Sequence, residues 1–426
     1  MCYNINRNIK GEKMSIIKKQ HIYLPSKKLD LSRWAVIACD QFTSEPKYWQ
    51  DLRKYVGDAP STLDLIVPEI YLPATSEMIN QVNFNMNHYL MHDKLRDVGE
   101  SMILVNRSTK LHPKRLGIVL NVDLEAYDFA PKSQALIKAT EGTIIERIPP
   151  RLEVRKDAPF ELPHIMLLYD DRVEKIAETL YNRRCDLESV YDFDLNMDGG
   201  HLQGWKIDNV DEVIKQFESL ISPAYIRNTF GTEKPLMFAV GDGNHSLATA
   251  KAHWDKIKTT LTPKQRENHP ARYALVEVVN IHDQGIEFEP IYRIVKNAGK
   301  DFVKGLQGLC KNKTYAIQQI FVDGDQTVEY KVPNNSPLAI KMVQDYIDAY
   351  LQKHKKAKVD YVHGISNLRD ICLADSKNTI GITLPTIKKE ELFAFVIKHG
   401  VLPRKSFSIG EAFEKRYYLE AHKITL

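Results

Sequence analysis

The amino-acid sequence predicts a mixed α/β protein, an α+β arrangement in which strands and helices are interspersed. Short runs rich in Ile, Leu and Val alternate with longer segments in which apolar residues recur every three to four positions. Several neighbouring apolar runs are joined by turn-forming residues, which indicates β-hairpins rather than one doubly wound sheet. The chain has 426 residues, too many for one ordinary core, so we expect two or three domains.

The predicted elements follow one another along the whole chain. The first half is predicted to contain strands at residues 34–40, 101–108, 116–129 and 163–171, helices at 46–56, 78–99, 170–184 and 211–225, and a turn at 192–200 that leads into a short strand. The second half is predicted to contain a strand at 235–240, a helix at 246–257, paired strands within 271–295 and 313–333, a helix at 336–354, and a terminal loop, short helix and strand from residue 400.

A domain boundary is predicted near Gly231 and Pro235, two turn-forming residues between a predicted helix and a predicted strand. It divides the chain into an extension or disordered segment at residues 1–20, an N-terminal α/β domain at 21–230 and a C-terminal α/β domain at 231–426. The C-terminal domain would carry both the GDGNHS loop and the LPRKS loop.

The composition indicates a cytoplasmic protein. Hydrophobic residues make up 43% and charged residues 27%, as in ordinary globular enzymes, and the net charge is only +4. This small excess is spread along the chain, so nucleic-acid binding is not expected, whereas a phosphorylated ligand would be attracted. Five scattered cysteines argue against a disulfide framework or a zinc site. No apolar run is long enough to span a bilayer, the first residues lack an apolar signal core, and Met14 is an alternative start.

The first candidate site is the turn GDGNHS, residues 241–246, between a predicted strand and a predicted helix. The first N–H groups of a helix have no partner inside the helix, so they and the helix dipole favour a phosphate or carboxylate group. Gly241 and Gly243 would allow a positive φ or a close approach of the backbone to a ligand. The pattern is neither a Walker loop nor a Rossmann fingerprint, because Ser246 stands where the latter needs glycine.

The side chains of this turn suit a phosphorylated ligand. Asp242 would orient a hydroxyl group or hold Mg²⁺ through water, and His245 would donate to phosphate or transfer a proton near neutral pH. Ser246 would cap the helix and contact an anion. The alternative is an ordinary turn in which Asn244 or Ser246 caps the helix and His245 lies at the surface. The local pattern leaves both interpretations open.

The second candidate site is the segment KATEGTIIERIPPR, residues 138–151. Glu141 would act as a general base if its surroundings desolvate it partly, and Thr143 is a possible neighbouring ligand. Arg147 and Arg151 would bind phosphate oxygens with paired hydrogen bonds. The two prolines before Arg151 predict an extended stretch. The alternative is a solvated surface hairpin whose Glu–Arg pairs contribute little energy.

Two further segments carry candidate residues. The loop GVLPRKSFSIGEA combines Lys405 and Ser406, a cation beside a neutral donor, which suits a phosphate group; a plain polar loop is the alternative. Asp40 ends a predicted strand, and the carboxyl ends of strands are where α/β sheets bind ligands. Thr43 and Ser44 follow it and are expected to cap the next helix.

Five stretches of the chain together resemble a known family. WAVIACDQFTSEPKYW, ATEGTIIERIPPR, LPHIMLLYDD, VGDGNHSLATAK and GVLPRKSFSIGEAFEKRYYLE resemble, in this order, the long-chain branch of the domain of unknown function 1015 family. The resemblance runs from about Trp34 to the end of the chain. Much of that family looks like D-G-H-H-R where this chain has DGNHS, so Asn244 and Ser246 replace His and Arg. The Lys-Ser pair of the family is matched by Lys405 and Ser406.

The D-G-H-H-R loop is also similar to one in the ParB and sulfiredoxin group, whose members bind nucleotides through it and include kinases of free serine. This resemblance implies a ParB/sulfiredoxin-like nucleotide-binding core, onto which Asp242 and His245 carry over directly. The general base does not carry over; the residues themselves favour Glu141, with Asp40 as the alternative. The residues expected to bind nucleotide or phosphate are Gly241, Gly243, Asn244, Ser246, Thr143, Arg147, Arg151, Lys405 and Ser406.

The leading hypothesis is a nucleotide-dependent kinase of a small hydroxylated metabolite, with free L-serine as the preferred substrate. ATP or ADP would donate the phosphoryl group, and Mg²⁺ would bridge phosphate oxygens. Glu141, Asp242, His245 and Asp40 are the candidate catalytic residues. One alternative is a nucleotide-binding regulatory protein without turnover. Another is phosphatase or nuclease chemistry from the same loops.

Overall fold

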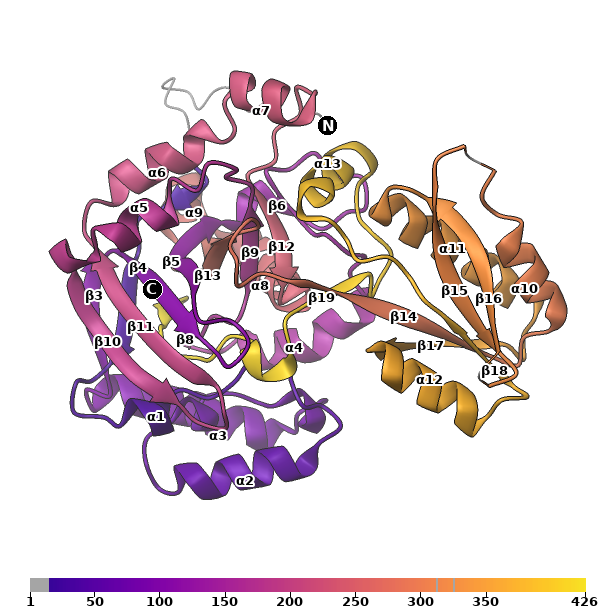
Figure 1. The fold of residues 1–426 in the computed structure, drawn as a ribbon. Coiled ribbons are helices and arrows are strands. Elements are labelled where there is room, and N and C mark those ends of the chain that lie inside the picture. The colour runs from indigo at the N-terminus through magenta and orange to yellow at the C-terminus, as the bar shows by residue number, and fades with distance from the viewer. Residues whose placement is uncertain (1–14, 312, 325) are drawn as a thin grey trace.

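The computed structural model describes residues 15–311, 313–324 and 326–426, and it confirms a mixed α/β fold. Figure 1 shows a larger lobe and a smaller lobe joined by strand β14 (Phe288–Lys296). A ten-stranded sheet forms the centre of the larger lobe and a six-stranded sheet forms that of the smaller one. None of the helices in the described ranges has the length and hydropathy needed to cross a bilayer.

The ten-stranded sheet mixes antiparallel and parallel pairs. Its strands, in spatial order, are β10 (Glu188–Leu195), β11 (Gly200–Ile207), β4 (Met102–Ser108), β5 (Arg115–Asp123), β13 (Tyr273–Asn280), β9 (Met166–Tyr169), β12 (Phe238–Asp242), β7 (Ile137–Lys138) and β6 (Tyr127–Asp128), with β1 (Ile17–Lys18) beside β5. Strand β12 pairs antiparallel with β9 and parallel with β7. Every residue of β5 and β13 is buried, so the middle of the sheet is covered on both faces.

The helices of the larger lobe surround this sheet (Figure 1). They are α1 (Leu31–Trp34), α2 (Pro46–Val56), α3 (Ser76–Met91), α4 (Ile148–Arg155), α5 (Ala177–Asn182), α6 (Val210–Ser219), α7 (Pro223–Phe230), α8 (Asn244–Ile257) and α9 (Pro263–Asn268). Helices α4 and α8 pack against each other. Short antiparallel pairs, β2 (His21–Pro25) with β3 (Leu95–Glu100) and β8 (Phe160–Glu161) with β20 (His422–Lys423), complete the lobe.

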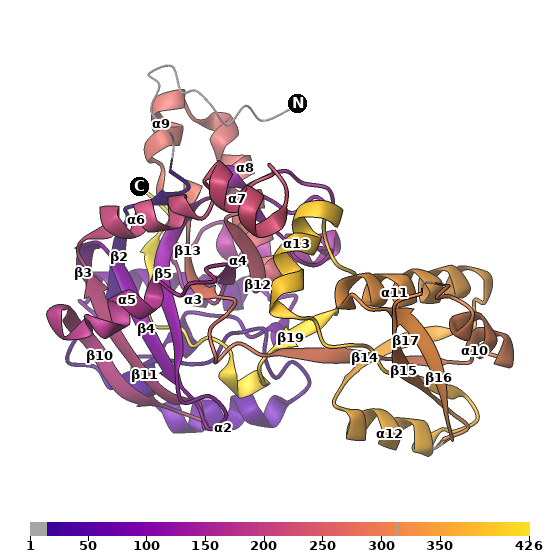
Figure 2. The same cartoon turned by 45° about the horizontal axis from the view of Figure 1, so that its top comes forward.

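The smaller lobe is an antiparallel sheet with its own helices. The strand order is β16 (Gln326–Pro333), β15 (Tyr315–Val322), β18 (Thr379–Ile382), β14 and β17 (Lys358–His363), and β19 (Phe407–Ile409) pairs with the first part of β14. Its helices are α10 (Lys300–Gln307), α11 (Ser336–Lys353) and α12 (Ile365–Ala374), and α13 (Lys389–His399) lies between the lobes, next to α7 (Figure 1). Figure 2 shows β14 extending from the larger lobe into this sheet.

The two lobes share one hydrophobic cluster. Met166 and Leu168 of β9 belong to the same buried cluster as Phe288 of β14 and Phe407 and Ile409 of β19. The chain then returns to the larger lobe, where Tyr417, Tyr418, Leu419, Ala421 and Ile424 are buried in the core of that lobe. The segment just before β19 is therefore held at the junction of the lobes, beside β9 and β12.

The large sheet spans the predicted boundary between residues 230 and 231. Strands β12 and β13 follow that boundary, yet they pair with β5, β7 and β9, which precede it. Residues 1–14 of the predicted extension at residues 1–20 lie outside the described residues. Its last part includes β1, which pairs with β5.

Several predicted elements have different bounds. The helix predicted at 78–99 ends at residue 91 and is followed by β3, and the turn predicted at 192–200 contains the end of β10. Asp192 and Asp194 lie on the exposed face of this strand, opposite buried Tyr191 and Leu195. The strand predicted at 34–40 is reduced to one bridge, Ile37 with Tyr417.

Two predicted helices are also shorter than expected. The helix predicted at 170–184 is limited to α5, and the one predicted at 211–225 is divided into α6 and α7. The division falls at Ser222, which caps the second helix, and Pro223, which occupies its first position.

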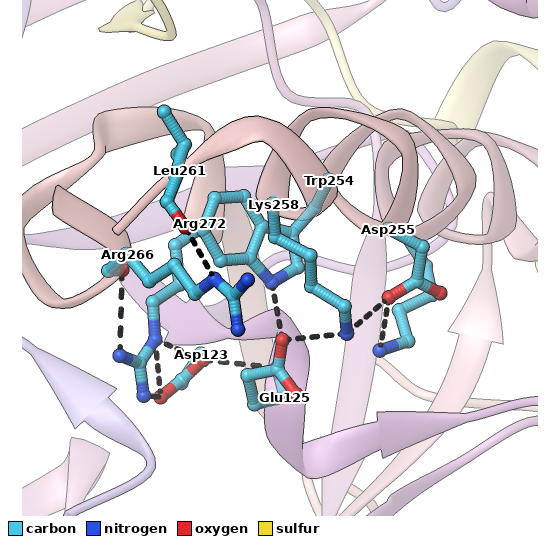
Figure 3. Close-up of polar contacts among 9 residues, drawn as sticks. Asp123, Glu125, Trp254, Asp255, Lys258, Leu261, Arg266 and Arg272 are labelled. Carbon is cyan, nitrogen blue, oxygen red and sulfur yellow. Dashed lines mark hydrogen bonds and ion pairs between the residues drawn. The ribbon is translucent and has the colours of Figure 1, made fainter. Parts of the chain in front are cut away.

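The far end of helix α8 is attached to the segment that follows strand β5 by part-buried polar contacts (Figure 3). Glu125 accepts hydrogen bonds from the indole N–H of Trp254 and from Lys258 Nζ, the latter at 2.8 Å. Beside it, Asp123 accepts from Arg272 Nε at 3.0 Å and from its Nη2 at 2.6 Å. The contacts of Glu125 hold the far end of α8 in a defined position, and the first residues of α8 lie at the carboxyl end of β12.

Replacing Arg272 with leucine is expected to lower the free energy of unfolding by about 3 kcal/mol, because the carboxylate of Asp123 stays buried without its cation. Urea unfolding followed by circular dichroism measures this loss. The double variant Arg272→Leu/Asp123→Asn removes the charge as well and should lose clearly less. An unfolding midpoint equal to that of the wild type for Arg272→Leu would contradict this role of the pair.

Candidate active site

Helix α8 begins directly after the turn that follows β12, and its cap residue has no side chain that could accept from the first N–H groups of the helix. The cap position is Gly243, with φ of 75°, and a Cβ there would lie 2.9 Å from the Cα of Ile165. The prediction that Asn244 or Ser246 caps the helix is therefore wrong. Among the described residues, no protein group accepts from the backbone N–H of Asn244 or His245. These two donors are available to an anion at the start of α8.

The side chains of this turn connect it to the segment after β7. Asn244 Nδ2 donates to the backbone oxygen of Glu141 at 3.3 Å and to Thr143 Oγ1 at 3.1 Å. His245 Nε2 accepts the backbone N–H of Ile144 at 3.2 Å. The first and second candidate sites are therefore adjacent, although they lie about a hundred residues apart in the sequence.

Glu141 connects the second candidate site to the third. Its carboxylate accepts the backbone N–H groups of Lys405 at 2.9 Å, Ser406 at 2.8 Å and Phe407 at 3.4 Å. The backbone also forms a parallel bridge between Glu141 and Leu402. The structure thus brings Glu141, His245 and Lys405 together, which is the spatial arrangement that a single site requires.

The contacts of Glu141 indicate how it acts. Burial raises its pKa, although the backbone donors of residues 405–407 act in the opposite direction. Three of its four lone-pair positions are occupied by N–H groups of this loop. Glu141 therefore holds the LPRKS loop in place. Lys405 adopts a left-handed φ of 57°, and its side chain is exposed.

The two arginines of the second segment have different surroundings. Arg147 is exposed, whereas Arg151 forms an ion pair with Glu69 and donates to the backbone oxygen of Arg147 at 2.8 Å. The extended stretch predicted for the two prolines is wrong. They lie in the first turn of α4, where the missing N–H of proline costs no helical hydrogen bond.

His245 is neutral at physiological pH. Burial lowers its pKa to about 4, and the nearby cations Arg147, Arg151 and Lys405 act in the same direction, while Asp40 acts against them. Because Nε2 accepts the Ile144 N–H, the proton of the neutral ring is on Nδ1. His245 is therefore a hydrogen-bond donor through Nδ1, surrounded by positive charge.

Asp242 is paired with a cation that the sequence analysis did not select. Lys415 Nζ lies 3.2 Å from the Asp242 carboxylate, which also accepts the N–H of Gly243 at 2.9 Å. Burial would raise the pKa of Asp242, but Lys415 and the Gly243 donor outweigh it and hold the pKa below its usual value. Gly241, which precedes Asp242 in the chain, leaves room for the side chains of Leu168 and Ile409. A Cβ atom at this position would lie 3.0 Å from each of them.

A chain of side chains leads away from Ser246. Its hydroxyl lies 2.7 Å from Nε2 of the buried His164, whose Nδ1 is 2.9 Å from the hydroxyl of Tyr418. His164 Nε2 is also 4.0 Å from the carboxylate of Asp40. The sequence analysis assigned no role to His164 or Tyr418; both lie in stretches that resemble the family, which was the one available signal.

The remaining predicted residues have local partners. Asp40 accepts from the side-chain amide of Gln41 at 3.0 Å, and Ser406 is buried and donates to the backbone oxygen of Pro403 at 2.6 Å. Thr43 and Ser44 do not cap α2, whose cap position is the next residue.

Within the described ranges, no group of three or more His, Cys, Asp or Glu side chains is placed to hold a metal ion.

The sequence profile of one family matches residues 20–371, most of the chain. That family is described as "Protein of unknown function (DUF1015)". This chain belongs to it. Among curated proteins, no match is found.

Several solved structures are similar to this member of the family at low sequence identity. A conserved hypothetical protein from Pyrococcus furiosus has 10% identity and a TM-score of 0.34, and covers 71% of this chain and 94% of its own. A free serine kinase in complex with AMP has 10% identity and a TM-score of 0.37, with 72% and 92% covered. SbnI with C-terminal truncation from Staphylococcus aureus has 11% identity and a TM-score of 0.36, with 68% and 82% covered.

Replacing Glu141 with glutamine is expected to loosen the LPRKS loop, because the amide keeps only one acceptor oxygen for the three N–H groups that it holds. Hydrogen exchange at the Lys405 and Ser406 amides should become about 10-fold faster or more. Glu146→Gln, an exposed change in the same segment, serves as the control. Equal protection of both amides in the wild type and in Glu141→Gln would refute the anchoring role.

Replacing Arg147 with glutamine is expected to raise the pKa of His245 from about 4 towards its ordinary value of 6.5, because one nearby cation is removed. The histidine ring signals in an NMR titration report this change. The lowered pKa also makes folding stability depend on pH. In the unfolded chain His245 binds a proton below about pH 6.5, whereas in the folded protein it binds one only below about pH 4. His245 therefore reduces folding stability as the pH falls through this window, and a pKa for His245 at or above 6.5 would exclude this account.

Proposed function

We propose that this protein is a nucleotide-dependent phosphotransferase that acts on a small hydroxylated metabolite. The observation that supports this most is the meeting of three loops at the start of α8, held together by Glu141, Asn244 and His245. Phosphoryl transfer depends mainly on positioning and on neutralising negative charge, and these loops supply donors and cations for both.

The phosphate groups would lie at the start of α8. The N–H groups of Asn244 and His245, for which no described residue provides an acceptor, and the Nδ1–H of His245 are neutral donors at the start of the helix. Arg147 and Lys405 have exposed side chains near His245, whose pKa they lower, and they would supply the positive charge. Thr143, next to Asn244, adds a hydroxyl group.

We assign the general base to Asp40 rather than to Glu141. The carboxylate of Glu141 is occupied by three backbone donors, and that of Asp242 is paired with Lys415. Among the described residues, only Gln41 donates a hydrogen bond to the carboxylate of Asp40, whose side chain is 23% exposed. It is close enough to His245 to affect the pKa of that residue, so it lies near the proposed phosphate site.

The nucleotide would bring Mg²⁺ with it. Without a preformed group of three protein ligands in the described ranges, the ion would be held largely by phosphate oxygens, as is common for Mg²⁺, with at most one or two carboxylates. Free L-serine is the first acceptor to test, and Ser246 adds a hydroxyl group at the start of α8. In this arrangement Glu141 is a positioning residue.

Incubation with ATP or ADP, Mg²⁺ and a panel of hydroxyl compounds that includes L-serine should give a phosphorylated product, identified by ³¹P NMR and mass spectrometry. Nucleotide binding without any product would favour a regulatory protein, and release of inorganic phosphate alone would favour hydrolase chemistry. Either result would reject the phosphotransferase.

Replacing His245 with glutamine is expected to reduce kcat by about 100-fold or more, because glutamine can still accept the Ile144 N–H but offers no imidazole donor at the same position. Asp40→Asn should have a similar effect on kcat through loss of the base. His399→Gln, an exposed substitution on α13, is the control. The melting temperatures of all three should stay within a few degrees of the wild type, and full activity in His245→Gln would contradict its role.

A further inference from the structure

A cavity lies beside the candidate active site, next to α4 and α8. Its wall is mainly apolar and includes Leu65, Val67, Met86, Val154, Leu162 and Ile165. Ser246, His164 and Arg151 also line it, and Ser246 belongs to the GDGNHS turn itself. The cavity therefore shares a wall with the site proposed to bind phosphate.

The size of this cavity indicates what it can hold. Its volume is about 160 Å³. An apolar cavity of about 150 Å³ is large enough for one benzene ring. A purine base has a second fused ring and ring nitrogens that need hydrogen-bond partners when they are buried, so this cavity suits a single ring or a chain of similar size better than it suits the base of a nucleotide.

The charged groups on the cavity wall are already paired with each other. Arg151 is paired with Glu69, and Arg155 with Glu161 at 2.5 Å. A ligand that enters the cavity therefore meets mostly aliphatic surface, and its burial is favoured by the hydrophobic effect. Val154 of α4 and Leu162, just after β8, both contribute to this surface.

We propose that the cavity binds an apolar group of about six carbon atoms carried by the acceptor substrate. This rests on the proposed function and narrows its substrate class to amphipathic hydroxyl compounds, whose hydroxyl group would lie at the polar wall with Ser246 and His164. In the transfer itself, the hydroxyl oxygen bonds to the terminal phosphorus of the nucleotide. The bond from that phosphorus to its bridging oxygen breaks, and the hydroxyl proton passes to Asp40.

Two acceptors that differ only by such a group provide the test. 3-Phenylserine has the hydroxyl, amino and carboxyl groups of L-serine and adds one six-carbon ring. Calorimetric titration of the wild-type protein should give a dissociation constant about 10- to 100-fold lower for 3-phenylserine than for L-serine, as expected for burial of one apolar side chain.

A variant that fills the cavity should remove this preference. Val154→Phe places extra volume in the cavity, while Glu153→Phe adds the same side chain at an exposed position of the same helix. We expect Val154→Phe to bind the two acceptors equally and Glu153→Phe to behave like the wild type. Leu162→Phe fills the cavity from a different segment and replaces Val154→Phe if that variant does not fold.

The outcomes separate the cavity from the phosphotransferase. Equal binding of both acceptors to the wild type overturns the inference. Loss of ADP affinity in Val154→Phe also overturns it, because the cavity then holds the nucleobase. If 3-phenylserine binds more tightly and Val154→Phe abolishes this, the cavity assignment stands; failure of that bound acceptor to be phosphorylated with ATP or ADP then rejects the proposed function alone.

Discussion

The arrangement of the candidate site depends on the contacts of one carboxylate with backbone N–H groups. Glu141 accepts from Lys405 and Ser406, which lie 264 and 265 residues further along the chain. The same segment receives the side chain of Asn244 and donates the N–H of Ile144 to His245. A buried carboxylate is unfavourable unless such donors surround it, so the loop near the C-terminus and the segment after β7 stabilise each other at the start of α8.

This arrangement brings two exposed cations close to the start of α8. Arg147 and Lys405 are exposed cations near a histidine whose pKa is about 4, and the first N–H groups of α8 point into the same region. Asp242, which could neutralise them, is paired with Lys415 instead. These cations and the backbone donors of α8 would favour an anionic ligand, which supports the proposed phosphate site.

The sequence was sufficient for the fold class and for the strand, turn and helix around GDGNHS, because periodicity and the two glycines are local signals. It was insufficient for the pairing of Asp242 with Lys415 and for the contacts of His164, because these depend on how distant segments pack. Local reasoning also failed for the two prolines before Arg151, since proline is unfavourable inside a helix but suitable in its first turn. The meeting of the three loops required the folded chain.

The most direct test of the central claim is whether the first N–H groups of α8 bind phosphate. In protein labelled with ¹⁵N at asparagine and histidine, the amide signals of Asn244 and His245 can be followed during titration with ADP and, as a control, with adenosine. We predict large shifts and slower hydrogen exchange for these two amides with ADP and none with adenosine. Saturating ADP that leaves both amides unchanged would contradict an anion site at this helix.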